Sequence, residues 1–380
     1  MKIIYISSST IPSRTANSIH VMKMCQAFQQ NGNAIELLAP QRNTSNGLNN
    51  HQDIWTHYGI RNTFPIRWIQ YSQTLRLYHY AVKSGVYAYK ANPQLVLTRN
   101  LPAAAVTAGL GLPTICELHQ PPPKNLGIRL LAMGRGFLKI VVISKALKMA
   151  LLERFKNNLL GDQILVSPDA VDLECFRNLP DAPTARKKLN LLQKSPTIGY
   201  AGHFYKGRGI KVILKLAAHF PKLQFILMGG NDSDIEKYVH ESQRMGLKNV
   251  QFLGFIPNAE LPLHLAACDA LLMPYQDKIS GSSGGDISSW LSPMKMFEYM
   301  AARRVIIASN LPVFHEVLNE KNAMFCQPDN LDDWVKALSQ VIQNKKQVEE
   351  LAEQAWKDVL QFSWEKRAIR IIENLEKKAE

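Results

Sequence analysis

A chain of 380 residues suits two or three domains of ordinary size and leaves ample length for buried cores. Its five cysteines form no C-x-x-C pair, which argues against a zinc ribbon and a disulfide framework, and no apolar run reaches the roughly 18 residues of a membrane span. The net charge of +14 lies mostly in residues 1–178, where 19 Lys and Arg residues face 8 Asp and Glu residues. Such an excess implies an acidic partner, either an anionic substrate or an anionic lipid surface. Nucleic acid is disfavoured, because no nucleic-acid-binding motif accompanies the charge.

Short apolar runs alternate with helical patterns along the whole chain, which is typical of doubly wound parallel sheets. The expected strands span residues 2–6, 34–39, 95–98, 114–118, 140–143, 164–167, 197–200, 225–228, 250–253, 270–273, 305–307 and 323–326. Half of them fall in each half of the chain, so the sequence predicts an α/β protein with two tandem Rossmann-like domains. A proline-rich break near 178–196 separates an N-terminal domain, 1–178, from a C-terminal domain, 179–361. The amphipathic segment 362–380 is expected to form a helix that packs back on either domain.

Two basic segments of the first domain are candidates for a membrane-facing surface. Their basic residues are Arg76, Lys83, Lys90, Arg129, Arg135 and Lys139. The first segment, 71–89, would line its charges along one helix face, although a solvated face explains them as well. The second, 125–139, is similar to an interfacial helix, although core packing could use the same apolar residues. We therefore expect a cytoplasmic protein that can lie peripherally on the inner face of the membrane.

Glu117 and His119 close the fourth expected strand, just before three consecutive prolines. Residues two apart on a strand share a face, and the prolines make the exit from the strand rigid. A lone histidine is more often structural, but ligands of parallel sheets bind at the carboxyl ends of the strands. His119 is therefore a candidate to donate a hydrogen bond, as a neutral imidazole, to a sugar hydroxyl.

Residues 199–209 form a strand that runs into a glycine-rich loop and then a helix from about Ile210. Glycines such as Gly202 let the backbone approach a ligand, while Lys206 and Arg208 supply cations for a diphosphate. The loop matches neither the P-loop nor the dinucleotide-binding fingerprint, so an ordinary basic surface loop stays open as the alternative.

The stretch SPMKMFEYMAARR, which begins at Ser292, predicts a helix whose start binds an anion. Ser292 is the expected N-cap and Pro293 the first helical residue, so the free N–H groups of the first turn would point toward a phosphate. Lys295 and Glu298 lie three apart and share a face, with the ammonium beside the phosphate and the carboxylate one turn deeper. A carboxylate can accept two hydrogen bonds from a ribose diol, so this helix is expected to bind a nucleoside diphosphate.

In their order along the chain, these motifs resemble the retaining glycosyltransferases of family 4, the glycosyl transferases group 1. The resemblance is carried by Gly202–Gly209, LMGG at 227–230, MPY at 273–275, SPMKMFEYMAARR and LPVFHEV at 311–317, with VISKAL at 142–147 and SPDAVDLECF at 167–176 in the first half. It implies the GT-B fold, two Rossmann-like domains that face a cleft, with the acceptor bound by 1–178 and the donor by 179–361. It also implies no metal and no cofactor, because cations and helix N-termini hold the diphosphate.

The resemblance also implies roles for single residues. Glu298 corresponds to the carboxylate on the donor ribose, Arg208 stands where the family has a lysine on the diphosphate, and His203 stands where it has an arginine. The implied catalytic residues are His119, Arg208 and Lys295, and the implied donor-binding residues are Gly202, His203, Lys206, Gly229, Trp290, Ser292, Met294 and Glu298.

The sequence departs from the family pattern at two places. The family pairs two glutamates eight positions apart, and at the first of these positions this chain has Trp290, eight before Glu298. The usual Gly-Gly loop near the N-terminus is also absent. Small hydroxylated residues take its place, so Ser13, Asn17 and His20 are the expected acceptor-side residues.

The expected activity is retaining transfer of a sugar from a UDP- or GDP-type nucleoside diphosphate sugar to a saccharide or lipid-linked acceptor. Cell-envelope or exopolysaccharide synthesis is the expected setting. Two alternatives stay open: a sugar-nucleotide epimerase on the same fold, and a non-catalytic sugar-nucleotide-binding protein with a decayed site. Trp290 makes the second conceivable, whereas Lys295, Glu298 and Arg208 argue against it.

Overall fold

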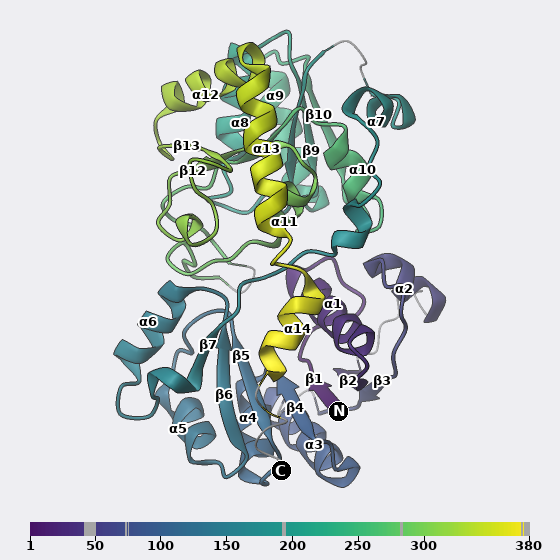
Figure 1. Cartoon of the computed structure of the whole chain (residues 1–380), viewed down its shortest axis with the longest axis vertical. Coiled ribbons are helices and arrows are strands. Elements are labelled where there is room, and N and C mark those ends of the chain that lie inside the picture. The colour runs from purple at the N-terminus through teal and green to yellow at the C-terminus, as the bar shows by residue number, and fades with distance from the viewer. Residues whose placement is uncertain are drawn as a thin grey trace. The chain divides into compact units, whose positions relative to one another are not determined.

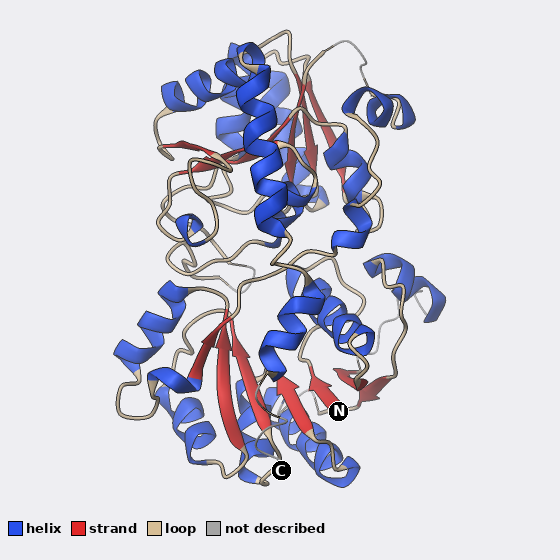
Figure 2. Ribbon diagram, viewed as in Figure 1, coloured by secondary structure: helices blue, strands red, loops and turns tan. Residues whose placement is uncertain are grey.

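The computed structural model describes residues 1–41, 51–72, 74, 76–191, 195–281, 284–373 and 375 (Figure 1). The chain divides into two compact units, Met1–Asp169 with Trp364–Glu380, and Ala170–Ser363. Each unit contains one parallel sheet with helices packed around it (Figure 2). The two expected Rossmann-like sheets are thereby confirmed.

The first unit holds a seven-stranded sheet in the order β3-β2-β1-β4-β5-β6-β7. Its strands are β1 Lys2–Ile6, β2 Ala34–Pro40, β3 Ile66–Ile69, β4 Leu95–Thr98, β5 Thr114–Leu118, β6 Phe137–Val142 and β7 Ile164–Val166. Its helices are α1 Ala16–Gln30, α2 His51–Tyr58, α3 Arg76–Ala91, α4 Leu101–Gly109, α5 Asn125–Met133, α6 Lys145–Arg154 and α14 Trp364–Ile372. The strand order reverses between β1 and β4, and such a switch point opens the carboxyl ends of the strands to ligands.

Two elements of this unit differ from those expected from the sequence. Strand β3 was not expected, because it has only four residues, of which Ile69 alone is buried, and it lies at the sheet edge. The expected helix over 125–139 ends at Met133, and the chain enters β6 at Phe137. A Cβ on Gly136 would lie 2.0 Å from the backbone oxygen of Leu112, so only glycine lets the chain pass into the sheet there.

The second unit holds a six-stranded sheet in the order β10-β9-β8-β11-β12-β13. Its strands are β8 Thr197–Ala201, β9 Gln224–Met228, β10 Val250–Gly254, β11 Ala270–Met273, β12 Val305–Ser309 and β13 Met324–Cys326. Its helices are α7 Ala182–Lys188, α8 Ile210–His219, α9 Asp232–Arg244, α10 Leu261–Ala266, α11 Met294–Ala301, α12 Leu331–Gln343 and α13 Lys345–Val359. Here the order reverses between β8 and β11. None of the helices described in either unit is long and apolar enough to cross a bilayer.

The chain enters the second unit after Asp169 and leaves it after Ser363, whereas the sequence analysis placed these boundaries at residues 178 and 361. Val171 and Phe176 lie in the apolar core of the second unit, which explains why this segment belongs to it. The last helix, α14, belongs to the first unit and packs against α1 (Figure 1).

Candidate active site

The glycine-rich loop of the second unit connects β8 to α8. Gly202 has a φ of 130° and Gly229, after β9, a φ of 104°, values that other residues rarely adopt. A Cβ on Gly202 would lie 2.8 Å from Nζ of Lys295, and a Cβ on Gly229 would lie 2.4 Å from the backbone oxygen of Gly202. The two glycines therefore let the ends of β8 and β9 meet each other and the Lys295 side chain.

Lys295, in the first turn of α11, has a buried amino group. Its Nζ lies 3.7 Å from the centre of the Tyr200 ring and has no hydrogen-bond partner among the described residues. Burial, and secondarily the Arg208 guanidinium, hold the pKa of Lys295 well below its usual value, while Glu298 one turn later acts in the opposite direction. An anion beside Nζ would compensate the lost hydration and the repulsion from Arg208 together.

Arg208 and Lys295 both lie close to the ring of Tyr275, which follows β11. Cζ of Arg208 lies 4.9 Å from the centre of that ring, and Nζ of Lys295 lies 5.3 Å from it. Aromatic contacts stabilise cations but do not neutralise them, and Nε of Arg208 is also buried without a hydrogen-bond partner in the described part of the chain. The arrangement can therefore bind a group with several negative charges, such as a diphosphate.

The two other basic candidates of the loop have different environments. The His203 ring stacks on Tyr205, with ring centroids 4.7 Å apart. Lys206 is exposed, so the structure does not bring its side chain into the buried cationic pair. Of the two cations expected in this loop, Arg208 is half-buried and Lys206 is exposed to solvent.

The start of α11 differs from the expected helix start. The helix begins at Met294, and Pro293 occupies the N-cap position without a side-chain hydrogen bond, so Ser292 is not the N-cap. Ser292 is buried instead, and Trp290 lies half-buried in the turn before it. Pro293 has a φ of −78° and a ψ of 127°, which is an extended conformation, so the first helical turn starts one residue later than expected.

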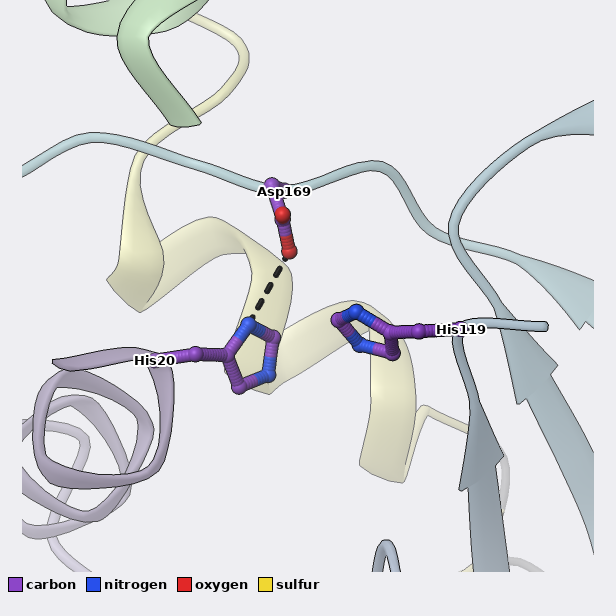
Figure 3. Close-up of side chains that lie close together, drawn as sticks. All are labelled: His20, His119 and Asp169. Carbon is purple, nitrogen blue, oxygen red and sulfur yellow. Dashed lines mark hydrogen bonds and ion pairs between the residues drawn. The ribbon is translucent and has the colours of Figure 1, made fainter. Parts of the chain in front are cut away.

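A second cluster lies in the first unit, where α1, the end of β5 and the segment after β7 meet (Figure 3). His20 stands between two carboxylates, with Nδ1 2.9 Å from Oδ1 of Asp169 and Nε2 2.8 Å from Oε1 of Glu117. Nε2 of His119 lies 2.6 Å from the same Glu117 oxygen. The structure therefore brings together His20, an expected acceptor-side residue, and His119, an expected catalytic residue.

Arg367 of α14 completes this cluster. Its guanidinium binds both carboxylate oxygens of Glu117, at 3.2 and 3.3 Å, and Arg367 itself is 3% exposed. It also donates to the backbone oxygens of Pro168 and Ser167. Burial alone would raise the pKa of Glu117, but Arg367 and the two histidines hold it well below its usual range.

The ionisation of the other members follows from the same contacts. Burial opposes the charge on Asp169, yet its hydrogen bond with His20 lowers the pKa of that carboxyl. Burial, followed by the nearby Arg99 cation, lowers the pKa of His119 to about 4. At neutral pH the cluster therefore contains two carboxylates and an uncharged His119.

His20, His119 and Asp169 each offer one ligand atom, and these atoms lie within 4.8 Å of one another. A metal requires nitrogen atoms with free lone pairs. Carboxylate oxygens already lie beside both ring nitrogens of His20 and beside Nε2 of His119. The Arg367 guanidinium places a positive charge next to Glu117, which disfavours a second cation there. The donor set therefore fits a hydrogen-bonded network better than a metal site.

Ser13 and Asn17 lie at the start of α1, which is capped by Thr15. Oγ of Ser13 forms hydrogen bonds with the hydroxyls of Thr15 and Ser18, at 2.9 and 2.8 Å. Oδ1 of Asn17 is buried without a hydrogen-bond partner in the described part of the chain. Among the contacts of the described residues, His20 is the one acceptor-side candidate that is bonded to the cluster around Glu117.

Several residues of the two clusters were not singled out from the sequence. These are Arg99, Asp169, Tyr200, Tyr275 and Arg367. Asp169 and Tyr275 lie inside the motifs SPDAVDLECF and MPY. These motifs indicate the family but do not indicate what either residue does. Arg367 is one of many basic residues in the terminal helix, and no sequence signal distinguishes it.

The family model described as glycosyl transferases group 1 matches residues 181–358, a range that contains the whole buried cationic pair and its glycines. Residues 181–358 of this chain therefore match the glycosyl transferases group 1 family. The family resemblance stated from the motifs is thereby confirmed.

Curated relatives match parts of the chain. A phosphatidyl-myo-inositol mannosyltransferase from Mycolicibacterium smegmatis is 24% identical over 245 residues, which cover 61% of this chain and 56% of that protein. A 2-deoxystreptamine glucosyltransferase from Streptomyces kanamyceticus is 31% identical over 128 residues, which cover 31% of this chain and 32% of that protein. The matches thus span about half, or less, of the length of these relatives.

Solved structures match the fold over almost the whole length. Anabaena Alr3699/HepE in complex with UDP gives a TM-score of 0.75 at 16% identity and covers 99% of this chain and 100% of that chain. These values establish a shared fold, and this chain has the GT-B architecture of two parallel α/β sheets, as expected.

Proposed function

We propose that this protein is a retaining glycosyltransferase that moves a sugar from a nucleoside diphosphate sugar to a saccharide or lipid-linked acceptor. The observation that carries the proposal is a pair of buried basic nitrogens near Tyr275, Nζ of Lys295 and Nε of Arg208, which have no hydrogen-bond partner in the described part of the chain. A diphosphate would place negatively charged oxygens beside these two basic side chains and accept hydrogen bonds from them. Anabaena Alr3699/HepE, which has the same fold, was solved with UDP-glucose, so a UDP-type donor is our first candidate.

In this proposal the second unit binds the donor. Glu298 accepts hydrogen bonds from the ribose hydroxyls, and the backbone at Gly202 and Gly229 lies against the diphosphate. Lys295 and Arg208 stabilise the diphosphate as it leaves the sugar. Transfer then depends on charge stabilisation in the transition state more than on any single base.

The first unit binds the acceptor in this proposal. His119 lies near the reacting sugar, and its lowered pKa supports an uncharged imidazole at the pH of the reaction. Ser13, Asn17 and His20 contribute to the acceptor side, His20 through its contacts with Glu117 and Asp169.

We further propose that α3 and α5 dock on an anionic lipid surface. Their exposed apolar side chains are Leu77, Tyr78, Val82, Val86 and Tyr89 of α3 and Leu126, Leu130 and Met133 of α5. Both helices pack against α4, and the exposed basic residues on or next to them include Lys83, Lys90, Arg129 and Arg135. Apolar side chains between basic ones are typical of interfacial helices. The Mycolicibacterium relative, named for a phosphatidylinositol substrate, supports a lipid-linked acceptor.

The donor assignment is tested by calorimetric titration of UDP into the full chain and into Lys295→Met. The substitution keeps most of the side-chain volume and removes the charge, so we expect UDP affinity to fall by 10- to 100-fold, roughly the 1.5–3 kcal/mol of a charged hydrogen bond. Lys215→Met, at an exposed position of α8, is the matched control and should leave UDP affinity unchanged. Equal affinity in both variants and the parent would reject the assignment.

A further inference from the structure

We infer that Arg367 is a positioning residue: through Glu117 it fixes His119 as the tautomer that carries its proton on Nε2, so that Nδ1 meets the substrate as a hydrogen-bond acceptor. The tautomer is a property of the first unit by itself. Its use in sugar transfer rests on the proposed function.

Glu117 is the centre of the arrangement. Its side chain is fully buried, and its Oε1 lies 2.6 Å from Nε2 of His119, 2.8 Å from Nε2 of His20 and 3.2 Å from Nη2 of Arg367. A buried carboxylate oxygen with three nitrogen neighbours accepts hydrogen bonds and has none to donate.

Arg367 keeps that carboxylate ionised and fixed in direction. Its second terminal nitrogen binds Oε2 of Glu117, so the two groups form a bidentate pair, and its Nε and Nη2 are anchored to the backbone oxygens of Pro168 and Ser167. A planar guanidinium held at both ends allows the carboxylate only one orientation. In that orientation Oε1 points at His119.

The proton of the His119–Glu117 hydrogen bond therefore resides on the imidazole. The groups that act electrostatically on His119 are Glu117, Asp169 and Arg99, and His20 packs edge-on against its ring. Burial and then Arg99 lower the pKa of His119 to about 4, so the ring is uncharged at neutral pH and has a single N–H. Since Nε2 donates to Glu117, Nδ1 has a lone pair.

The free nitrogen of His119 is the one available to a ligand. The His119 side chain is 22% exposed, and within the described residues its only hydrogen bond is the one from Nε2. In this inference His119 accepts a hydrogen bond from the ligand, in place of the donor role expected from the sequence. The group that it meets must offer a hydrogen, as a hydroxyl or an amine does, and a carboxylate or an ether oxygen would be disfavoured at this position.

The tautomer is tested by long-range 1H–15N spectra of the full chain with 15N-labelled histidine, with the His119 signals assigned by a His119→Gln variant. At pH 7 we expect the Nε2–H form, with Nδ1 at the shift of an unprotonated nitrogen. In Arg367→Gln, Glu117 loses its fixed direction and its cation, and we expect a mixture of tautomers. The same single form in that variant, or the Nδ1–H form in the parent, would overturn the inference.

Controls separate positioning from simple loss of structure. Arg370→Gln lies on the same helix at a position without an ion pair among the described residues, and it should leave the spectrum unchanged. Should Arg367→Gln not fold, Glu117→Gln provides the second test, because its amide can donate to Nε2 and should favour the Nδ1–H form. These spectra require no substrate, so they stand even if no transferase activity is found.

Activity gives an independent readout. In Arg367→Gln we expect kcat to fall by about 10- to 100-fold, as for other residues that orient a functional histidine, with the KM for the donor within about twofold. Arg367→Lys, which keeps the charge but not the bidentate geometry, should recover part of kcat. A KM effect without a kcat effect would contradict the positioning role.

Discussion

Single charges decide the chemistry of the two clusters, and Arg99 is the clearest case at the residue scale. Arg99 follows β4, and its cation is the largest cause, after burial, of the lowered pKa of His119. We expect Arg99→Leu to raise that pKa from about 4 toward 6.5 and to move the acid limb of kcat/KM upward by the same amount. NMR titration of His119 measures the change, with Arg244→Leu on the exposed face of α9 as control. An unchanged titration would show that burial alone sets the pKa.

The carboxylate one turn after Lys295 should act on the nucleoside. If Glu298 accepts two hydrogen bonds from the ribose diol, Glu298→Gln is expected to weaken UDP binding by one or two orders of magnitude without loss of the fold. Trp290→Ala should instead change affinity for the intact sugar nucleotide and spare UDP. Calorimetric titration of both variants with both ligands separates the two roles. If the Glu298→Gln variant melts cooperatively and still binds UDP with normal affinity, Glu298 does not bind the ribose.

At the element scale, α3 and α5 combine exposed apolar and basic side chains, as a docking surface requires. Each basic residue near an anionic membrane contributes about 1 kcal/mol, and the Debye length shrinks from about 10 Å at 0.1 M salt to about 3 Å at 1 M. We expect the protein to float with anionic liposomes, and the fraction that floats should decrease as the salt concentration rises. Binding should be lost when Lys83, Lys90, Arg129 and Arg135 are changed to glutamate. Lys345→Glu with Lys346→Glu, at two exposed positions of α13, is the control. Equal recovery on neutral liposomes would reject the surface.

At the scale of the whole molecule, the stability of the first unit should depend on pH through His119. The unfolded state binds a proton near pH 6.5 and the folded state only near pH 4, so the unfolded state holds more protons between these values. Stability therefore falls as the pH is lowered through this window, by on the order of 3 kcal/mol. Hydrogen exchange of first-unit amides at pH 7 and 4.5 measures the loss, after correction for intrinsic exchange rates. His119→Gln should remove most of this loss, and an equal loss in that variant would show that His119 is not its cause.

Nucleotide binding should also stabilise the molecule without a metal. A ligand at about 100 times its dissociation constant adds about 2.7 kcal/mol. We expect UDP to raise the melting temperature in the presence of EDTA, and GDP, ADP and dTDP serve as comparison ligands. A shift that needs a divalent cation would contradict the metal-free diphosphate site, and no shift with any nucleotide would remove the main support for the donor site.

The sequence by itself determined the features that depend on neighbours along the chain. The alternation of apolar runs predicted both parallel sheets, and the glycine loop, Lys295 and Glu298 were identified from local spacing. Edge strand β3 could not be predicted from the sequence, because Ile69 is the one buried residue among its four. The helix start at Met294 could not be predicted either, because it depends on the backbone conformation of Pro293. Periodicity reports burial on a regular element, so short edges and helix ends are where it is least informative.

Only the tertiary structure decided which charges meet. Arg367 and Glu117 are 250 positions apart, and His20 and Asp169 are 149 apart, so no local pattern could pair them. The same holds for the aromatic face over Lys295, which comes from Tyr200 and Tyr275 at the ends of two different strands. Protonation states follow from burial and from such distant partners, which is why the sequence identified His119 and the structure assigned its proton.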